Sequence, residues 1–404
     1  MKLTDTADQV WVRRRNRAII LETLRTSHTL SRAGLASATQ LNPSTVSSII
    51  SELINENLVR ETDLIQPATG RPGRLVELNP LGGCSVGVEI NVDYVMVILT
   101  DFTANILLRA RRALRPTDNQ ELILDRVERL VKQALLEGEA SNLRPLGIGV
   151  GLPGLVSFPR GELKLAPNLN WRNIPLQELW VQKFALPVYV ENEANAAALG
   201  EFYFGEAQGV ENFIYLSAGI GLGGGVIING KLFRGSSGYA SEVGHMTIDP
   251  QGSLCGCGKR GCLETLAGPR AVVERVARTL KTGLASSLSE LQNGGSGQLT
   301  FDDVIEAAQA NDPVALAALE EVGRVLGVGV ANLVNIFNPE LVVLGGALNQ
   351  ASSIILPVVK QAVQENALEP SAENLQITPS ALGADACVMG AVALVLDEIL
   401  REIN

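Results

Sequence analysis

The chain has 404 residues, of which 46% are hydrophobic and 4% aromatic, and its net charge is −10. This length and composition exclude a single small domain and predict two or three α/β units with a core of Leu, Val, Ile and Ala. Residues 1–20 lack a long apolar stretch with a cleavage pattern, and no uncharged apolar run is long enough to cross a bilayer. We therefore expect a cytoplasmic protein without a membrane partner.

Residues 13–63 contain three amphipathic segments, which predict three short helices. The second helix is expected to begin after Ser31 and the third after Asn42 and Pro43, because Ser and Asn cap helix starts and Pro suits the first turn. The inward face of the third helix is Val46, Ile49, Ile50, Leu53 and Ile54. Residues 57–63 and 74–80 are β-prone and flank the Gly/Pro-rich stretch 64–73, which predicts a hairpin.

Two short helices joined by a tight turn and followed by a hairpin are typical of a winged helix-turn-helix, which we assign to residues 1–80. This segment has ten Lys and Arg against eight Asp and Glu, so it carries +2 and the remainder −12. The candidate contacts with operator DNA are Asn42, Ser44, Thr45, Ser47 and Ser48 on the third helix and Arg71 and Arg74 near the wing tip. Small helical interaction modules look similar, and that interpretation stays open.

From about residue 85 the pattern changes to strands that end in Gly-rich or polar turns, followed by helices. Four such strands lie within residues 146–156, 186–205, 212–235 and 340–348. Strands that end in polar turns indicate an α/β fold that binds ligands at the strand ends. We therefore expect a cleft between two lobes.

Five motifs in this region resemble those of one family: "IGVGLPG", "ENEANAAALGE", "GIGLGGGVIINGKLFRGSSGYASEVGH", "CGCGKRGCLE" and "NPELVVLGG". In this order they resemble the ROK family, which contains bacterial sugar kinases and transcriptional repressors on the actin-like ATPase (ribonuclease H-like) fold. With the winged helix-turn-helix in front, the chain is most similar to the repressor branch, especially to xylose-repressor-like members. The resemblance implies a two-lobed α/β body.

The chain has five cysteines, an odd number, and three of them lie within residues 255–262. Such spacing favours a metal or redox cluster over disulfides. The set His245, Cys255, Cys257 and Cys262 supplies one nitrogen and three sulfurs, which matches a closed, structural, tetrahedral Zn²⁺ site. A redox or buried thiol cluster is the alternative. We expect Cys84 and Cys387, which are distant in sequence, to be small core residues.

The resemblance to the ROK family also implies a sugar site. Its lining residues would be Asn168, Asn192, Glu193, Glu242, His245 and Glu264, with Gly151 and Pro153 forming one wall. A hydroxyl-rich ligand needs such acceptors and amides, because unpaired buried polar groups are costly. A plainer interpretation makes Asn192 a helix cap and Glu193 an acid of the first turn, and Asn170 is as polar a candidate as Asn168.

Three departures from the kinases of the family predict that the chain is not an enzyme. Ile90, Asn91 and Val92 stand where the kinases have a small Gly-Gly-Thr turn for ATP phosphates. Ile220 replaces a hydroxyl-bearing Thr in the second glycine loop, and Glu193 replaces the catalytic Asp with one extra methylene.

We therefore expect a sugar-responsive transcriptional repressor whose effector is xylose, or glucose as second choice. The alternatives are an ATP-dependent sugar kinase and a regulator controlled by a phosphotransferase-system protein. We expect the smaller lobe to comprise residues 81–195 with 385–404. The larger lobe, residues 196–384, would carry the zinc loop and the surface of a homodimer or dimer of dimers.

Overall fold

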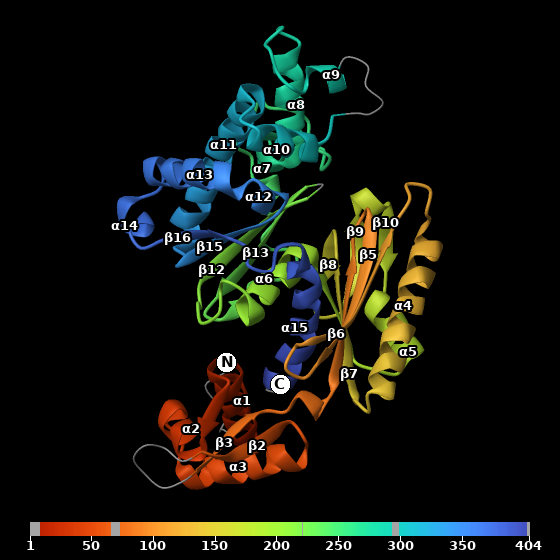
Figure 1. The fold of residues 1–404 in the computed structure, drawn as a ribbon, viewed down its shortest axis with the longest axis vertical. Helices are drawn as coiled ribbons and strands as arrows, with labels where there is room; N and C mark the ends of the chain where they lie inside the picture. Colours follow the sequence, from red (N-terminus) through yellow and green to blue (C-terminus); the bar gives the residue numbers. More distant parts are fainter. Residues whose placement is uncertain (1–8, 66–72, 220, 293–298, 402–404) are drawn as a thin grey trace.

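The computed structural model describes residues 9–65, 73–219, 221–292 and 299–401. Figure 1 shows a small N-terminal head at one end and a larger body made of two lobes. Each lobe is built around a five-stranded sheet. The α/β fold class expected from the sequence is confirmed. Among the described helices, none combines the length and the apolar character that a membrane crossing requires.

The head contains three helices and a three-stranded sheet of order β1-β3-β2. The helices are α1 (Gln9–Ser27), α2 (Arg32–Thr39) and α3 (Pro43–Asn55), and the strands are β1 (Thr29–Ser31), β2 (Val59–Ile65) and β3 (Gly73–Leu78). Ser31 caps α2 by accepting from Gly34 N at 3.0 Å, and Asn42 caps α3. The predicted helices and hairpin are confirmed, and the predicted inward face of α3 is buried except at Ile54, which is half-buried.

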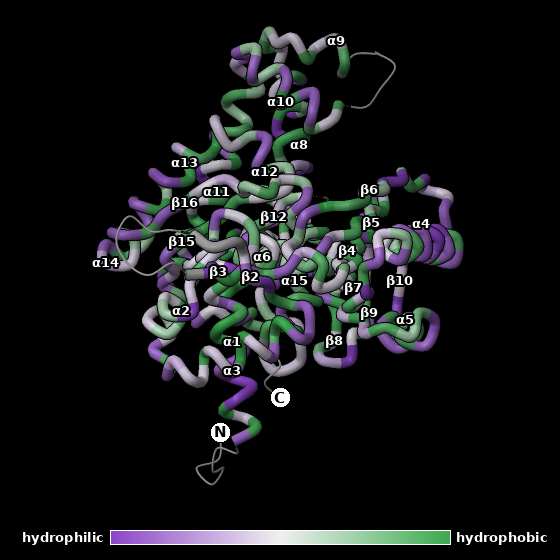
Figure 2. The backbone as a smooth tube through the Cα atoms, turned by 60° about the horizontal axis from the view of Figure 1, so that its bottom comes forward, coloured by the Kyte–Doolittle hydropathy of each residue, from purple (hydrophilic) through white to green (hydrophobic). Residues whose placement is uncertain are grey.

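The first lobe has a sheet of order β11-β7-β4-β5-β6, in which β4, β7 and β11 run parallel. Its strands are β4 (Cys84–Ile90), β5 (Tyr94–Asp101), β6 (Ile106–Ala113), β7 (Pro145–Leu152) and β11 (Val188–Asn192). One face packs on α4 (Gln120–Ala140) and the other on α15 (Ala386–Arg401), so the central strand β4 is buried along its whole length. Figure 2 shows these strands as hydrophobic and the outer turns of α4 as hydrophilic.

A small sheet and several short helices extend the first lobe. Its strands β8 (Leu155–Ser157), β9 (Glu162–Ala166) and β10 (Trp171–Ile174) form antiparallel pairs. Helix α5 (Leu176–Phe184) packs beside β11. The one-turn helices are η1 (Pro80–Gly82), which follows the head, and η2 (Pro167–Leu169).

The second lobe has a sheet of order β14-β13-β12-β15-β16. Its strands are β12 (Phe213–Ala218), β13 (Leu222–Ile228), β14 (Lys231–Leu232), β15 (Leu341–Gly346) and β16 (Gln376–Pro379). One face packs on α6 (Glu193–Phe204) and the other on a cluster of helices. These outer helices and turns are η3 (Val243–His245), α7 (Leu263–Ala267), α8 (Pro269–Leu280), α9 (Ser289–Gln292), α10 (Phe301–Gln309), α11 (Pro313–Phe337), α12 (Ala347–Gln350), α13 (Ser352–Asn366), α14 (Glu369–Ala372) and η4 (Gly383–Asp385).

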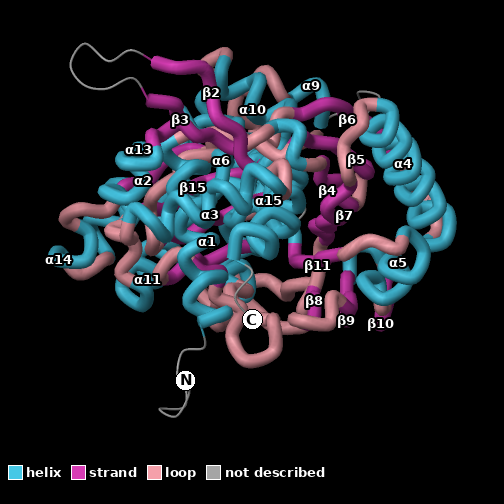
Figure 3. Tube along the Cα trace, turned by 90° about the horizontal axis from the view of Figure 1, so that it is seen from below, coloured by secondary structure: helices cyan, strands magenta, loops and turns pink. Residues whose placement is uncertain are grey.

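Helices α6 and α15 join the two lobes by packing against each other between the sheets (Figure 1). Their approach requires glycine on both sides. A Cβ on Gly200 would lie 2.4 Å from the carbonyl oxygen of Ala386, and one on Gly390 would lie 1.7 Å from that of Ala196. Figure 3, seen from the head, shows α1 and α3 in front of α6 and α15. The head is therefore placed where the two connecting helices end.

Candidate metal centre and ligand-binding cleft

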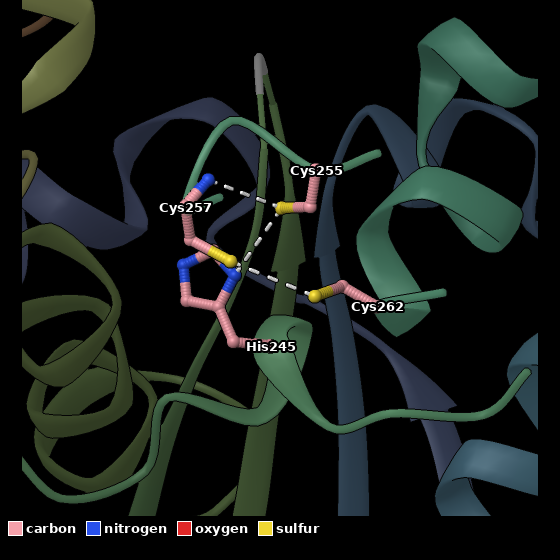
Figure 4. Close-up of side chains that lie close together, drawn as sticks. All are labelled: His245, Cys255, Cys257 and Cys262. Atoms are coloured by element: carbon pink, nitrogen blue, oxygen red, sulfur yellow. Dashed lines mark hydrogen bonds between the residues drawn. The ribbon is translucent and has the colours of Figure 1, made fainter. Parts of the chain in front are cut away.

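Four soft ligands meet in the loop between η3 and α7 of the second lobe (Figure 4). The ligand atoms of His245, Cys255, Cys257 and Cys262 all lie within 4.8 Å of one another. Cys255 Sγ is 3.7 Å from His245 Nδ1, and Cys257 Sγ is 3.7 Å from Cys262 Sγ. Two isolated β-bridges, Thr247 with Cys262 and Leu254 with Arg260, fold the loop back on itself. This NS₃ set can hold a metal ion.

The three thiols of the cluster differ in the direction of their pKa shifts. Burial raises the pKa of Cys255 and of Cys262 above the usual thiol range. The pKa of Cys257 is lowered, because the backbone hydrogen bond from Lys259 and those from the neighbouring thiols outweigh its burial. A bound cation would favour all three thiolates together. Cys84 and Cys387 are buried and remote in sequence, as expected of core residues.

His245 presents its two ring nitrogens to different groups. Nδ1 lies beside Cys255 and is 3.8 Å from Glu264 Oε1, whereas Nε2 is 4.0 Å from Glu242 Oε2. One nitrogen can therefore bind a metal while the other remains available on the side of Glu242. The two roles expected for His245 are geometrically compatible.

Glu264 connects the metal-ligand loop to the hairpin formed by β12 and β13. Its Oε1 accepts from Cys255 Sγ at 2.8 Å, and its Oε2 accepts from Leu222 N at 3.4 Å. Leu222 is the first residue of β13, directly after the glycine-rich tip. Ile220, which the sequence singled out in that tip, lies outside the described residues.

Asn192 and Glu193 lie at the junction of β11 and α6. Asn192 Oδ1 accepts from Ala194 N and Asn195 N, so Asn192 is the helix cap that the plainer interpretation predicted. Its Nδ2 donates to Gly154 O at 2.9 Å, which leaves a second amide hydrogen for another acceptor. Capping and ligand binding are thus compatible for this residue.

The charge of Glu193 is influenced by an acid from each lobe, Glu89 and Glu242. Burial, with the charges of Glu89 and Glu242 nearby, raises the pKa of Glu193 to about 7. Burial also raises the pKa of Glu89 and of Glu242. Glu242 belongs to the second lobe and Glu89 to the first, so the charges that act on Glu193 come from both lobes.

The expected wall of the cleft lies at the end of β7. Gly151 is in register with Glu89 on β4 and with Glu191 on β11. A Cβ on Gly151 would lie 2.5 Å from Cys387 Sγ, so no larger residue fits there. Pro153 follows β7 and is buried. Asn168 is exposed in η2, and none of the described hydrogen bonds joins it to the other candidates.

Glu89 is a buried acid that acts on the charge of Glu193 and that the sequence analysis did not single out. It is 3% exposed, and its Oε1 accepts from Tyr94 Oη at 2.6 Å and from Asn91 Nδ2 at 3.3 Å. Its Oε2 has no hydrogen-bond partner. A single carboxylate inside the apolar strand "CSVGVEI" was the available signal, because an acid at such a position is rarely structural.

Only some of the described candidate DNA-contacting residues of the head are both exposed and without a protein partner for the side-chain group that would contact DNA. Asn42 and Ser44 are exposed at the start of α3, Thr45 and Ser47 are half-buried, and Ser48 is exposed but accepts from Arg13 Nη2 at 3.2 Å. Arg74 pairs with Glu61 at 3.2 Å, and Arg71 lies outside the described residues.

Two arginines of the basic first helix are ion-paired to the third helix, which the sequence did not indicate. Arg13 pairs with Glu52, and Arg17 pairs with Glu52 at 3.2 Å and with Glu56. The pairs hold α1 against α3.

The ROK family model matches residues 85–398, from the first strand of the body almost to the end of α15. The chain belongs to the ROK family. It is 37% identical over 385 residues to the "Xylose repressor" of Caldicellulosiruptor bescii, which covers 95% of this chain and 96% of that protein.

Two solved ROK structures complete the comparison. The crystal structure of a ROK family transcriptional regulator, a homologue of the Escherichia coli MLC protein, has a TM-score of 0.84 at 30% identity and covers 97% of this chain and 98% of its own. A ROK family glucokinase from Streptomyces griseus, in complex with glucose and AMPPNP, has a TM-score of 0.68 at 33% identity and covers 77% of this chain and 99% of its own. The expected actin-like body with a preceding DNA-binding head is thus confirmed.

The turn between β4 and β5 contains Ile90, Asn91 and Val92, where the sequence predicts a difference from the kinases of the family. Asn91 Oδ1 accepts from Val92 N at 2.7 Å, and Asn91 Nδ2 donates to Glu89. Ile90 is fully buried. The backbone amide of Val92 is therefore already bound by the side chain of Asn91, whereas a phosphate-binding loop offers free backbone amides.

Proposed function

We propose that the protein is a sugar-responsive transcriptional repressor, in which the head binds operator DNA and the cleft of the ROK body binds a sugar. The observation that carries this proposal is that the similarity extends over head and body together: the C. bescii xylose repressor matches 95% of this chain, and the ROK transcriptional regulator has a TM-score of 0.84 across 97% of it. The glucokinase, by contrast, leaves about a quarter of this chain without a counterpart.

The effector we propose is xylose first and glucose second, because the C. bescii relative is named a xylose repressor. The ligand would bind among Gly151, Pro153, Asn168, Asn192, Glu193, Glu242, His245 and Glu264. Carboxylate oxygens accept hydroxyl hydrogens, and the amide of Asn192 donates, which suits a polyhydroxylated ring. An analogue lacking one hydroxyl would leave a buried polar group unpaired, at about 1–3 kcal/mol.

The metal we propose is a structural Zn²⁺ held by His245, Cys255, Cys257 and Cys262. Three thiolates favour zinc over magnesium or calcium, and four protein ligands leave no position for a reactive water. Zinc would hold the loop that carries His245 against Glu264. It would thereby orient the imidazole toward Glu242.

We propose that the chain has no kinase activity. The closed turn at Asn91 removes the amides that a kinase directs at ATP phosphates. Glu193 stands at the position of the catalytic Asp and is half-buried, with a raised pKa. A coupled ATPase assay with xylose or glucose tests this directly, and turnover above background would favour the kinase alternative.

The working assembly we propose is a homodimer, or a dimer of dimers, that presents two heads to a palindromic operator. The heads are residues 1–80, and the lobes are 81–195 with 385–404 and 196–384, the latter carrying the dimer surface. The sugar must bind the two lobe arrangements with different affinity, because otherwise it shifts no equilibrium.

The test is fluorescence anisotropy of labelled DNA from upstream of this gene and its neighbours, at fixed salt, with and without xylose, glucose and N-acetylglucosamine. Release of tight, sequence-specific binding by one sugar is the expected result. Specific binding that no sugar changes would point to another ligand or to a phosphotransferase-system protein. Absence of specific binding under every condition would remove the repressor proposal.

A further inference from the structure

Arg234 follows β14 in the second lobe, but its side chain contacts the first lobe. Its Nε donates to Glu191 Oε2 at 2.7 Å, and Glu191 is in β11. Its guanidinium carbon lies 4.2 Å from the ring centroid of Phe158, in the turn after β8. Arginine suits this position because its planar group can pair with a carboxylate and stack on an aromatic ring at once. The contact spans the two lobes beside the cleft.

Glu191 is the carboxylate that organises the start of α6. It is 2% exposed. Its Oε1 accepts from Asn192 N at 2.9 Å and from Asn195 Nδ2 at 3.1 Å, while Oε2 faces Arg234. A buried carboxylate without its cation is strongly unfavourable, so Arg234 stabilises the arrangement that orients Asn192.

The backbone of Arg234 begins the segment that leads to the second-lobe side of the cleft. Its carbonyl oxygen accepts from Gly238 N at 3.1 Å and from Ala240 N at 3.3 Å. Gly238 has φ +94°, and a Cβ there would lie 2.7 Å from Phe158 N, so the segment rests directly on the first lobe. Glu242 follows two residues after Ala240.

We propose that Arg234 is a positioning residue for sugar binding, which holds the segment carrying Glu242 and His245 against Asn192 and Glu193. The inference rests on the proposed function. Arg234 touches no expected sugar position, and it acts by fixing the distance between the two halves of the cleft. The Arg234–Glu191 pair therefore determines how closely the lobes approach when the sugar binds.

The variants are Arg234→Gln, Arg234→Lys, Glu191→Gln and the double variant Arg234→Gln/Glu191→Gln. The matched control is Arg270→Gln on α8, whose side chain is 86% exposed and pairs with Glu274. Calorimetry measures the affinity for xylose, and for glucose if xylose does not bind. Anisotropy measures operator affinity without sugar, and elemental analysis measures metal content.

We expect Arg234→Gln to weaken xylose binding about tenfold, a size typical of residues that act without touching the ligand. Arg234→Lys should weaken xylose binding less, because lysine keeps the positive charge but lacks the planar guanidinium that stacks on Phe158 and pairs with Glu191. The double variant should be no weaker than the worse single variant. Operator affinity without sugar and metal content should match the wild type.

Three results would overturn the role of Arg234. One is wild-type xylose affinity in Arg234→Gln, and another is independent, additive effects of Arg234→Gln and Glu191→Gln. The third, used if Arg234→Gln does not fold, is wild-type affinity in Arg234→Lys. A wild-type protein that binds neither xylose nor glucose would overturn the proposed function as well, so the two failures are distinguishable.

Discussion

Arg25 of the head binds the last turn of α6, where its Nη1 donates to the carbonyl oxygen of Tyr203 at 2.6 Å. Its guanidinium carbon lies 4.5 Å from the ring centroid of the same tyrosine, whose hydroxyl donates to Asp397 of α15. The last carbonyls of a helix lack partners within it, and a cation there is favourable. The head is thus attached to the end of α6, the helix that Asn192 caps at its start.

Replacement of Arg25 by Ala should weaken the coupling between cleft and head. We expect unchanged xylose affinity, because the residue is far from the cleft, but an effect of xylose on operator affinity that is about tenfold smaller. Calorimetry and DNA anisotropy measure the two quantities separately. Arg270→Ala on the exposed face of α8 is the control. If xylose still released DNA from Arg25→Ala as fully as from the wild type, Arg25 would not couple the cleft to the head.

Replacement of Arg71 by Ala should lower operator affinity while sugar binding stays intact. The loss of affinity should be similar for all DNA sequences. The slope of log affinity against log salt concentration should become shallower by about one, because a phosphate contact disappears. Arg74→Ala should have a smaller effect, since Glu61 already pairs with Arg74 at 3.2 Å. Anisotropy over a salt series measures both, and unchanged affinity in Arg71→Ala would remove the wing from the DNA-binding surface.

Metal removal should affect the sugar response more than DNA binding. We expect about one zinc per chain. Cys257→Ser should lose metal and sugar response, because the loop with His245 and Glu264 loosens, while operator affinity changes little. Cys84→Ala, which removes a buried thiol outside the cluster, is the control and should retain the metal. If Cys257→Ser lost operator binding as much as sugar response, the metal would not act mainly on the sugar site.

Glu193→Gln should change how stability depends on pH. Burial and the neighbouring Glu89 and Glu242 raise the pKa of Glu193 from 4.5 to about 7 in the folded protein. The folded state therefore holds an extra proton between these values, and the free energy of unfolding falls as pH rises through them. Glu193→Gln lacks this titration, so its free energy of unfolding should rise by about 1–2 kcal/mol relative to that of the wild type as the pH goes from 5.5 to 8.

Urea unfolding curves of Glu193→Gln and the wild type at several pH values measure this difference. Glu264→Gln is a useful comparison, since it alters a carboxylate that is not among the groups raising the pKa of Glu193. If the difference in the free energy of unfolding between the wild type and Glu193→Gln stayed constant across the pH range, Glu193 would not be held protonated in the folded protein.

Local signals in the sequence predict the features that depend on neighbouring residues. Ser31 and Asn42 cap the helices that they were expected to cap, and the metal ligands within residues 245–262 come together because short turns connect them. Strand β1 was missed, since its three residues are fixed only by pairing with β3. A strand this short has little periodicity of its own.

The contacts that complete the cleft depend on residues far apart in the chain. Glu89 and Glu191 meet Gly151 through strand register, and Arg234 reaches Glu191 across 43 positions. Neither relationship leaves a local pattern in the sequence. The same is true of Arg13 and Glu52, which pair across 39 positions.

Helix α6 has Asn192 in the cleft at its start and Arg25 of the head at its other end. Its twelve residues make a stiff lever about 18 Å long, so a tilt of about 10° at the cleft moves the far end by about 3 Å. In a two-fold dimer the displacement doubles to about 6 Å, which is close to two base-pair steps of DNA. In the proposed dimer, with a sugar bound in each protomer, a small rearrangement around each sugar would be enough to move the two heads out of register with adjacent turns of the operator.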